Sequence, residues 1–301
     1  MPSVTLRDVT LRDGLQDEDP VPLATKLALF DAIVAAGIAE LEVGSFVRAD
    51  RVPAMADSAE VCAATAAAVV TRWGLVLNEQ GAQRAVASGL RHLQYVVSVS
   101  DTHSRHNAGA PTDRAMAGLA SVVALGGGDV EVELTLATAF GCPYEHAVVP
   151  ARVAALAAQG ADLGAASVSL ADTIGVAVPT EVAALIDGVR ASTPVPLAVH
   201  LHDTRGLGVA NALAAIDAGV TRIDGSVAAL GGCPFAPGAS GNVALEDLVY
   251  ALDLMGIGTG VSLDGLIEAA GLAAAAVGRP VGSHVGVAGP RFVAIPGPHD
   301  G

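Results

Sequence analysis

The feature that most constrains this chain is a regular alternation of short apolar runs with longer alanine-rich stretches. The short runs are rich in β-branched residues and predict eight strands at residues 4–10, 40–44, 72–77, 92–98, 130–136, 167–170, 197–202 and 222–227. Between them, as at 22–36 and 178–190, apolar residues recur at helical spacing. Eight strand–helix units predict a (β/α)8 TIM barrel, and helical patterns at 246–256 and 263–277 predict a C-terminal helical extension.

Proline and glycine mark the helix ends. Pro22 and Pro179 stand where a first helical turn accepts proline. Four glycines close apolar helical patterns, as C-terminal caps do: Gly37, Gly89, Gly160 and Gly219. The alternative fold is a doubly wound open sheet, which would want a glycine-rich phosphate loop after the first strand. Arg12-Asp13-Gly14 is not such a loop. We therefore expect a single domain over 1–301, with the barrel at about 4–256 and a helix and tail at 257–301.

Charge and cysteine content narrow the partners. Sixteen Lys and Arg against 31 Asp and Glu give a net charge of −15. This charge argues against nucleic acid and membrane as partners, and it makes binding of a polyanion depend on local cations. Three cysteines, odd in number and widely spaced, imply no disulfide framework and fit a reducing cytoplasm. The longest uncharged run, 226–245, is broken by glycines and prolines and indicates a loop. We expect a cytoplasmic protein.

Two histidines on one predicted strand form half of a possible metal site. Side chains alternate along a strand, so His200 and His202 face the same way. Asp13 follows the first predicted strand and Asn242 follows the last. One carboxylate, two imidazoles and one amide carbonyl suit octahedral Mg²⁺ or Mn²⁺ better than a closed tetrahedral zinc site. Such an ion would act as Lewis acid and template, and Cys233, on a glycine-rich loop, could move a proton.

Polar residues stand at nearly every other predicted strand end, which is where a barrel carries its chemistry. They include Arg12, Glu42, Ser45, Asn107, Tyr144, Asp172 and Thr173. Each also has a plainer interpretation. A lone His-x-His is more often structural, and an Asp after a strand is most often a helix cap, which applies to Asp13 and more strongly to Asp172. Cys142 fits a packed core position as well as it fits a chemical role, and Cys62 is expected to be buried and inert. The joint occurrence favours a site.

Taken together, these motifs resemble those of the 3-hydroxy-3-methylglutaryl-CoA (HMG-CoA) lyase family of metal-dependent barrels. The resemblance covers roughly residues 4–285. It is carried by Arg12-Asp13-Gly14-Leu15-Gln16, Ser45-Phe46-Val47, Gly141-Cys142-Pro143-Tyr144-Glu145, Asp172-Thr173-Ile174-Gly175, His200-Leu201-His202-Asp203-Thr204 and the glycine-rich loop at 231–242. The last loop is similar to the lyase branch of the group rather than to its synthase or aldolase relatives.

The resemblance implies a role for each matching position. Asp13, His200, His202 and Asn242 would hold the divalent metal. Arg12 would stabilise the enolate of the departing thioester, Cys233 would deliver or take a proton, and Glu42 would support Arg12 or the metal waters. His200 and Asp172 would help to deprotonate the tertiary hydroxyl. Ser45, Asn107, Tyr144 and Thr173 are the candidate cofactor-binding residues. The implied reaction cleaves a 3-hydroxyacyl-CoA to acetyl-CoA and a keto acid such as acetoacetate.

The chain departs from the family pattern near the expected mouth of the site. Asp19 and Asp50 stand where the family commonly has lysine, Ala54 replaces a glutamine, and His146 follows Glu145 where a glycine is usual. The departures concern the acyl group and the CoA contacts rather than the metal residues. The cations that could restore positive potential there are Arg48, Arg51, Arg105 and His106.

Three functions remain open from the sequence. The first is an HMG-CoA lyase-like enzyme with an acyl-CoA substrate. The second is a related metal-dependent lyase or aldolase that acts on another 3-hydroxyacyl-CoA or on a 2-oxo acid. The third is a non-catalytic barrel that serves assembly or regulation. By the same resemblance we expect a homo-oligomer, a dimer.

Overall fold

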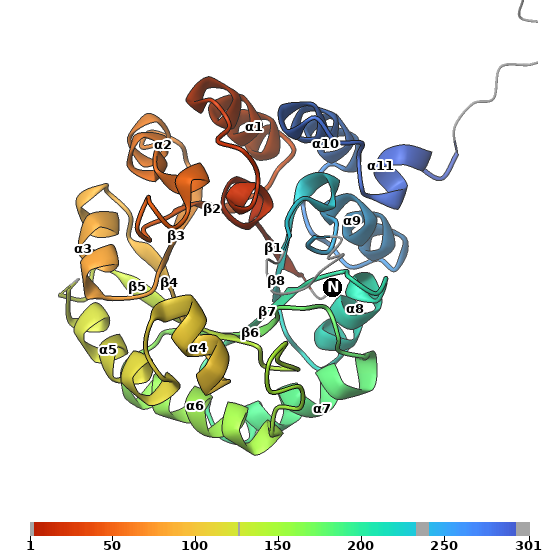
Figure 1. Cartoon of the computed structure of the whole chain (residues 1–301). Helices are drawn as coiled ribbons and strands as arrows, with labels where there is room; N and C mark the ends of the chain where they lie inside the picture. The colour runs from red at the N-terminus through yellow and green to blue at the C-terminus, as the bar shows by residue number, and fades with distance from the viewer. Residues whose placement is uncertain (1–2, 126, 233–240, 293–301) are drawn as a thin grey trace, which may run out of the picture.

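The computed structural model describes residues 3–125, 127–232 and 241–292. Eight parallel strands close into a barrel in chain order, because β1 pairs with both β2 and β8. Figure 1 shows the strands at the centre and helices around them. The closed barrel confirms the predicted TIM fold and excludes the open sheet. The strands are β1 (Thr5–Asp8), β2 (Glu40–Ser45), β3 (Thr71–Val76), β4 (His92–Ser98), β5 (Glu131–Ala137), β6 (Ser167–Asp172), β7 (Leu197–Leu201) and β8 (Arg222–Gly225).

The helices lie around the outside of this barrel. They are α1 (Leu23–Ala35), α2 (Ser58–Ala64), α3 (Glu79–Ala87), α4 (Asp101–Ala108), α5 (Thr112–Leu125), α6 (Pro150–Asp162), α7 (Pro179–Arg190), α8 (Gly208–Asp217), α9 (Leu245–Leu254), α10 (Leu263–Val277) and α11 (His284–Ala288). The main apolar core lies between these helices and the strands. In the part of the chain that the structure describes, no helix is long and apolar enough to cross a membrane.

One predicted helix end is wrong. Gly37, Gly89 and Gly219 have positive φ angles and follow their helices, as expected of helix C-caps. Gly160 instead lies inside α6, whose end is marked by Gly164 with a φ of 97°. A Cβ at Gly160 would stand 2.3 Å from Cδ2 of Leu134, so this glycine lets α6 approach β5 closely. Sequence alone does not separate a glycine needed for contact from one needed for a turn.

The first strand is shorter than predicted, and a short π-helix replaces its end. β1 stops at Asp8, and η1 (Thr10–Gly14) follows. The Asp8 carboxylate accepts hydrogen bonds from the backbone N–H and the hydroxyl of Thr10, at 3.0 and 2.7 Å, and so stabilises the turn out of the strand. Thr10 Oγ1 in turn accepts the N–H of Val227, at the start of the 3-10 turn η3 (Val227–Ala229). The π-helix carries Arg12 and Asp13 to the barrel mouth.

The barrel interior is polar, whereas branched apolar side chains usually fill it. Arg7, Gln94, Glu133, Ser167 and Asp224 are all buried. Glu133 accepts hydrogen bonds from Arg7 at 2.7 Å, from Gln94 at 3.2 Å and from Ser167 at 3.0 Å. Buried charges are tolerated only when they are paired and hydrogen-bonded, and this interior meets that condition.

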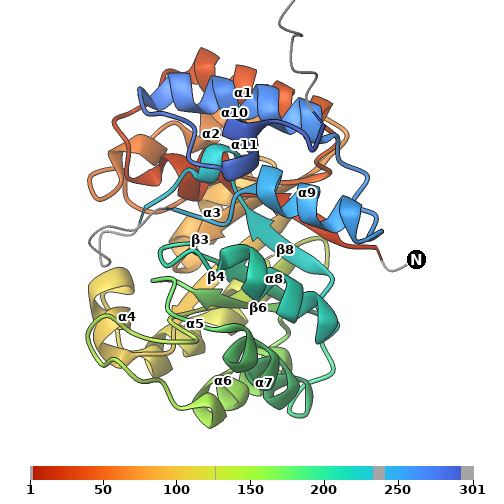
Figure 2. The ribbon, with the colours of Figure 1, turned by 90° about the vertical axis from the view of Figure 1, so that its right-hand side faces the viewer.

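The C-terminal extension packs across α1 and α9. Figure 2 shows α10 beside α1 along one side of the barrel, with α11 next to them. The N–H of Ser262 donates to the carbonyl of Ala36 at 2.7 Å, and Ser283 Oγ donates to Glu246 Oε1 at 2.9 Å. A further short turn, η2 (Pro53–Met55), follows β2. The part of the predicted tail at 293–301 lies outside the described residues.

Candidate active site at the mouth of the barrel

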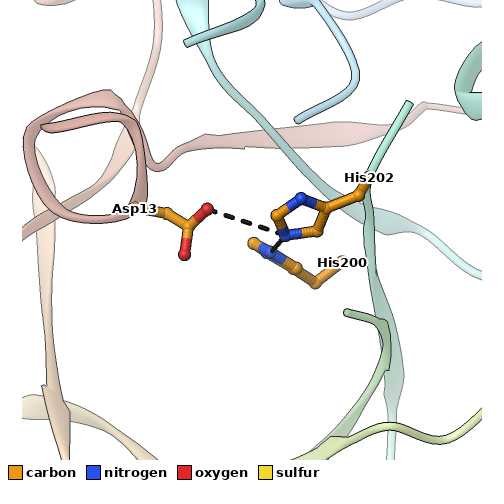
Figure 3. A group of neighbouring side chains, drawn as sticks. All are labelled: Asp13, His200 and His202. Carbon is orange, nitrogen blue, oxygen red and sulfur yellow. Dashed lines mark hydrogen bonds and ion pairs between the residues drawn. The ribbon is translucent and has the colours of Figure 1, made fainter. Parts of the chain in front are cut away.

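Asp13, His200 and His202 come together at the carboxyl ends of the strands. Asp13 comes from η1, His200 from β7, and His202 lies just beyond β7. One potential ligand atom from each lies within 4.8 Å of the others. The Nε2 atoms of the two histidines are 3.2 Å apart, and His202 Nε2 is 3.7 Å from Asp13 Oδ2. Figure 3 shows the three side chains pointing toward one another. A carboxylate and two imidazoles in this arrangement support a divalent metal.

Asn242 extends this group. Its backbone forms an isolated bridge with His202, and its Nδ2 donates to Asp13 Oδ2 at 2.8 Å and to the carbonyl of Leu230 at 2.9 Å. These two acceptors fix the amide orientation, which leaves Oδ1 buried and without a hydrogen-bond partner among the described residues. A buried carbonyl oxygen without a partner is costly unless a cation or water meets it. The donor set thus fits an oxygen- and nitrogen-ligated divalent ion.

Arg12 is fixed between two carboxylates. Its Nε donates to Glu42 Oε2 at 2.6 Å, and its Nη1 forms a short ion pair with Asp13 Oδ1. All three side chains are buried. Burial alone would lower the pKa of Arg12, but Glu42 and Asp13 raise it above the usual value. Arg12 is therefore a permanent positive charge, held in one position beside the metal residues.

Burial and the neighbouring charges shift the pKa values of the three metal residues in different directions. Burial would raise the pKa of Asp13, yet Arg12 and the two histidines hold it below its usual range. Burial lowers the pKa of His202 to about 4. Burial also opposes the charged form of His200, but its hydrogen bond to Asp224 and the charge of Asp13 raise its pKa. Asp13 is thus an anion and His202 a neutral imidazole at neutral pH, the forms in which both bind metals.

A cavity of about 620 Å³ opens above this group. Among the predicted site residues it is lined by Arg12, Asp13, Asn107, Thr173, His200 and His202. Glu42 and Asn242 lie behind this lining, where they contact Arg12 and Asp13. Arg48, Arg51, Arg84 and His106 also line the cavity, and Arg105 does not.

Three predicted site residues have other positions. The Asp172 carboxylate accepts the N–H groups of Val176 and Ala177, both at 3.0 Å, and is not part of the cavity lining. Burial raises its pKa. Ser45 is buried in β2, where its N–H donates to Ser58 Oγ. Tyr144 stacks on His106 with ring centroids 4.7 Å apart. Asp172 thus binds the loop before α7 and does not cap that helix, whose N-cap is Val178, and a catalytic role for it stays a prediction.

The cysteines divide by location. Cys233, the predicted proton carrier, lies outside the described residues. Cys62 is buried in α2, as expected, and burial raises the pKa of its thiol to about 11. Cys142 is buried with its Sγ 3.0 Å from Ser100 Oγ. Neither Cys62 nor Cys142 lines the cavity.

Two buried residues of the site were missed at the sequence level. Asp224, on β8, lines the cavity and lies 3.2 Å from Nδ1 of His200. Arg7, on β1, contacts Asp224 through Nε at 2.8 Å and Nη2 at 3.0 Å. The sequence signal for both is a charged residue in the middle of a predicted strand. Charges that lie inside a barrel must pair with one another, so two such residues predict a buried ion pair.

A closed barrel with an Asp and two His at the carboxyl ends of its strands defines the class of metal-dependent (β/α)8 enzymes. The model of the HMGL-like family matches residues 3–272, and the chain belongs to that family. The chain is 40% identical over 286 residues to mouse mitochondrial hydroxymethylglutaryl-CoA lyase, covering 94% of this chain and 88% of the relative. It is therefore a carbon–carbon lyase, and the non-catalytic interpretation is set aside.

Two further relatives bear on the substrate. The chain is 39% identical over 306 residues to the (R)-citramalyl-CoA lyase of Chloroflexus aurantiacus, covering 97% of this chain and 96% of the relative. It also superposes with a TM-score of 0.93 on an HMG-CoA lyase from A. baumannii determined with coenzyme A and 3-methylmalate. That alignment has 36% identity and covers 98% of both chains.

Proposed function

We propose that this lyase cleaves a 3-hydroxy-3-methylglutaryl-CoA-like thioester to acetyl-CoA and a keto acid, acetoacetate when the substrate is HMG-CoA. The observation that carries the proposal is Arg12, fixed by Glu42 and Asp13 beside the two histidines. In such a cleavage the C2–C3 bond breaks, the 3-hydroxyl loses its proton, and negative charge collects on the thioester oxygen. A preorganised cation at that oxygen lowers the barrier.

The metal site belongs to this proposal in its finer detail. Asp13, His200, His202 and Asn242 would hold Mg²⁺ or Mn²⁺, which when bound supplies a Lewis acid for the substrate hydroxyl and carbonyl oxygens. Glu42 fixes the guanidinium of Arg12 by accepting its Nε, while Nη1 pairs with Asp13. Cys233 would return a proton to the departing acetyl-CoA carbon.

The two roles implied for His200 compete for one nitrogen. Its Nδ1 faces Asp224, so only Nε2 is left for either a metal ion or a substrate proton. We therefore assign His200 to the metal. Asp172 is kept as the candidate proton acceptor of the hydroxyl on the resemblance alone, because its carboxylate does not line the cavity. Its two bonds to backbone N–H groups also hold the loop that follows Thr173, a residue of the cavity wall.

An acyl-CoA substrate is supported by the neighbouring structure with coenzyme A and by the cations of the cavity. Arg48, Arg51 and Arg84 line it on one side, and His106 and Asn107 contribute from α4. Phosphates are recognised by arginines in this way. We also propose a homo-oligomer, a dimer, on the resemblance alone.

A second candidate substrate is citramalyl-CoA. It is favoured by the (R)-citramalyl-CoA lyase that aligns with nearly the whole of this chain. In citramalyl-CoA the carboxylate is attached directly to C3, so the same bond cleavage gives acetyl-CoA and pyruvate. Both cleavages form the same acetyl-CoA enolate, so Arg12 and the metal residues would have the same roles with either substrate.

The test is a turnover assay with Mg²⁺ or Mn²⁺ on HMG-CoA and citramalyl-CoA, in which the keto acid is identified by mass spectrometry. We expect cleavage of HMG-CoA with a high KM, because Asp19 and Asp50 replace cations near the mouth. No HMG-CoA cleavage at millimolar concentration, with clear release of pyruvate from citramalyl-CoA, would establish the second candidate instead. Failure to cleave any 3-hydroxyacyl-CoA would overturn both.

A further inference from the structure

Asp224 receives three hydrogen-bond donors inside the barrel. Arg7 Nε lies 2.8 Å from Oδ1, Arg7 Nη2 lies 3.0 Å from Oδ2, and His200 Nδ1 lies 3.2 Å from the same Oδ2. All three side chains are buried. An ionised carboxylate can only accept hydrogen bonds, so the histidine nitrogen that faces it carries the proton.

Arg7 holds this carboxylate from a fixed position. Its Nη2 also donates to Glu133 Oε1 at 2.7 Å, and its guanidinium carbon lies 4.8 Å from the centroid of the Trp73 ring. Two carboxylates and an aromatic face thus surround one arginine. Asp224 cannot rotate away from His200 without losing its paired bonds to Arg7, which are charge-assisted and strong.

The consequence appears at the other ring nitrogen of His200. With the proton on Nδ1, a neutral ring keeps its lone pair on Nε2, and this atom faces His202 Nε2 at 3.2 Å, inside the cluster with Asp13. We propose that Asp224, held by Arg7, is a positioning residue that fixes the tautomer of His200 so that Nε2 is available as a metal ligand. The proposal rests on the metal site of the proposed function.

A purely structural ion pair would have a different effect. If Asp224 only balanced the charge of Arg7, neutralising it would cost stability and leave the tautomer of His200 unchanged. If it fixes the tautomer, the proton must lose its preference for Nδ1 when the acceptor is removed. Asp224→Leu removes both acceptor oxygens and keeps a side chain of similar shape.

An amide at this position would not remove the acceptor that His200 uses. Oδ2 accepts both Arg7 Nη2 and His200 Nδ1, so an Asn oxygen in that place would keep two of the three bonds and the proton on Nδ1. Leucine offers no acceptor in any orientation. Without a partner at Nδ1, the proton of the neutral ring is expected to shift toward Nε2.

Two measurements test this on the full chain. The first is ¹H–¹⁵N NMR of the metal-free protein, in a buffer alkaline enough to keep the ring neutral, which identifies the protonated nitrogen of His200. We expect Nδ1 in the wild type and a shift of the proton toward Nε2 in Asp224→Leu. The second is titration with Mn²⁺ alone, for which we expect binding weakened by about 10- to 100-fold, the usual effect of losing such a partner.

Glu133→Gln is the matched control. It removes the same charge from the same arginine, but Glu133 has no contact with His200 among its described hydrogen bonds. We expect it to keep the tautomer and to change Mn²⁺ affinity by less than about threefold. If Asp224→Leu does not fold, Arg7→Lys replaces it, since one ammonium cannot pair with both oxygens, and a smaller loss of affinity is expected.

The results separate the two claims. An unchanged tautomer in Asp224→Leu, or an equal loss of Mn²⁺ affinity in Glu133→Gln, would overturn the role of Asp224. If the wild type binds no Mn²⁺, the proposed metal site fails, while the NMR comparison still decides whether Asp224 sets the ring.

Discussion

At the scale of single residues, Asp13 connects every part of the site. It pairs with Arg12, accepts a hydrogen bond from Asn242 and lies 3.7 Å from Nε2 of His202. A substitution at Asp13 would therefore disturb several contacts at once. The histidines at the edge of the cluster are more informative, because each has fewer partners.

His202→Ala should remove one metal ligand and weaken divalent-metal binding severely while the fold persists. His202 makes no hydrogen bond through Nδ1 within the described residues, so the loss is confined to the Nε2 side. Calorimetric titration with Mn²⁺, with circular dichroism to check folding, measures both effects. The control is His92→Ala, since His92 starts β4 and packs on Trp73 away from the cluster. Equal Mn²⁺ affinity in the two variants would contradict the assignment.

Cys233→Ala should reduce turnover by roughly 10²- to 10⁴-fold, the usual range for one acid–base group. The basis is the sequence: Cys233 stands between Gly232 and Pro234, nine residues before Asn242. Cys62→Ala is the control, because that thiol is buried in α2 and outside the cavity lining. Near-full activity of Cys233→Ala on the true substrate would remove the thiol from the chemistry.

Some of these residues could be located from sequence, and others could not. The alternation of a strand places His200 and His202 on one face, and closure of the barrel brings Asp13 to them. Asp172 could not be assigned in this way, because a carboxylate after a strand can face either a cavity or its own loop. Its bonds to Val176 and Ala177 depend on how that loop folds back.

At the scale of elements, the junction of β1, η3 and α9 contains two buried carboxyl groups, those of Asp8 and Glu246. Asp8 accepts bonds from Thr10, and Glu246 accepts the N–H of Ala228 and the hydroxyl of Ser283. Burial raises the pKa of Asp8 and of Glu246 to about 7 each. The turn at Ala228, which has a positive φ of 57°, is thereby connected to both the first strand and the C-terminal segment.

This junction predicts a pH dependence of stability. Between the ordinary carboxyl pKa near 4 and the raised value near 7, folded Asp8 keeps a proton that the unfolded chain has lost. The unfolded state then binds fewer protons, so this contribution to stability is present at low pH and is lost as pH rises to about 7.

Asp8→Asn should remove this contribution. Relative to wild type, we expect its free energy of unfolding to rise by at least about 1 kcal/mol between pH 5 and pH 8, measured by urea denaturation in the presence of a chelator. The exposed Asp19→Asn is the control and should show no such change. A wild-type-to-Asp8→Asn difference that is constant with pH would disprove the assignment.

Strand starts were predicted better than strand ends. The run at 4–10 contains no proline or glycine, yet β1 ends at Asp8 because that side chain accepts a hydrogen bond from the Thr10 N–H. The run at 222–227 likewise ends as β8 at Gly225, before the turn at η3. Apolar patterns report burial, and both segments remain buried after they leave the sheet, so the pattern does not show where pairing stops.

At the scale of the whole molecule, a net charge of −15 repels a polyanionic substrate from most of the surface. The cavity is an exception, because several arginines line it. Arg48 is partly neutralised there: Asp50 accepts its Nε and Nη2 at 2.9 and 2.7 Å, and these bonds raise the pKa of Arg48. Local charge therefore decides how well an acyl-CoA enters.

Asp50→Lys should lower the KM for an acyl-CoA substrate by a few-fold and leave kcat nearly unchanged. The change releases Arg48 and adds a cation, but exposed charges are worth about 1 kcal/mol or less in salt. Steady-state kinetics at low and high salt would show the effect and its screening. The control is Asp253→Lys, the same charge change near the end of α9. A KM shift of equal size in the control would show that only net charge matters.

The central claim is that Asp13, His200 and His202 hold a divalent metal in a lyase barrel. Its most direct test is anomalous diffraction from crystals soaked in Mn²⁺. We predict one strong peak within about 2.5 Å of the Asp13 carboxylate and of both Nε2 atoms. No peak between these side chains after soaking, or Mn²⁺ bound only elsewhere on the protein, would contradict it.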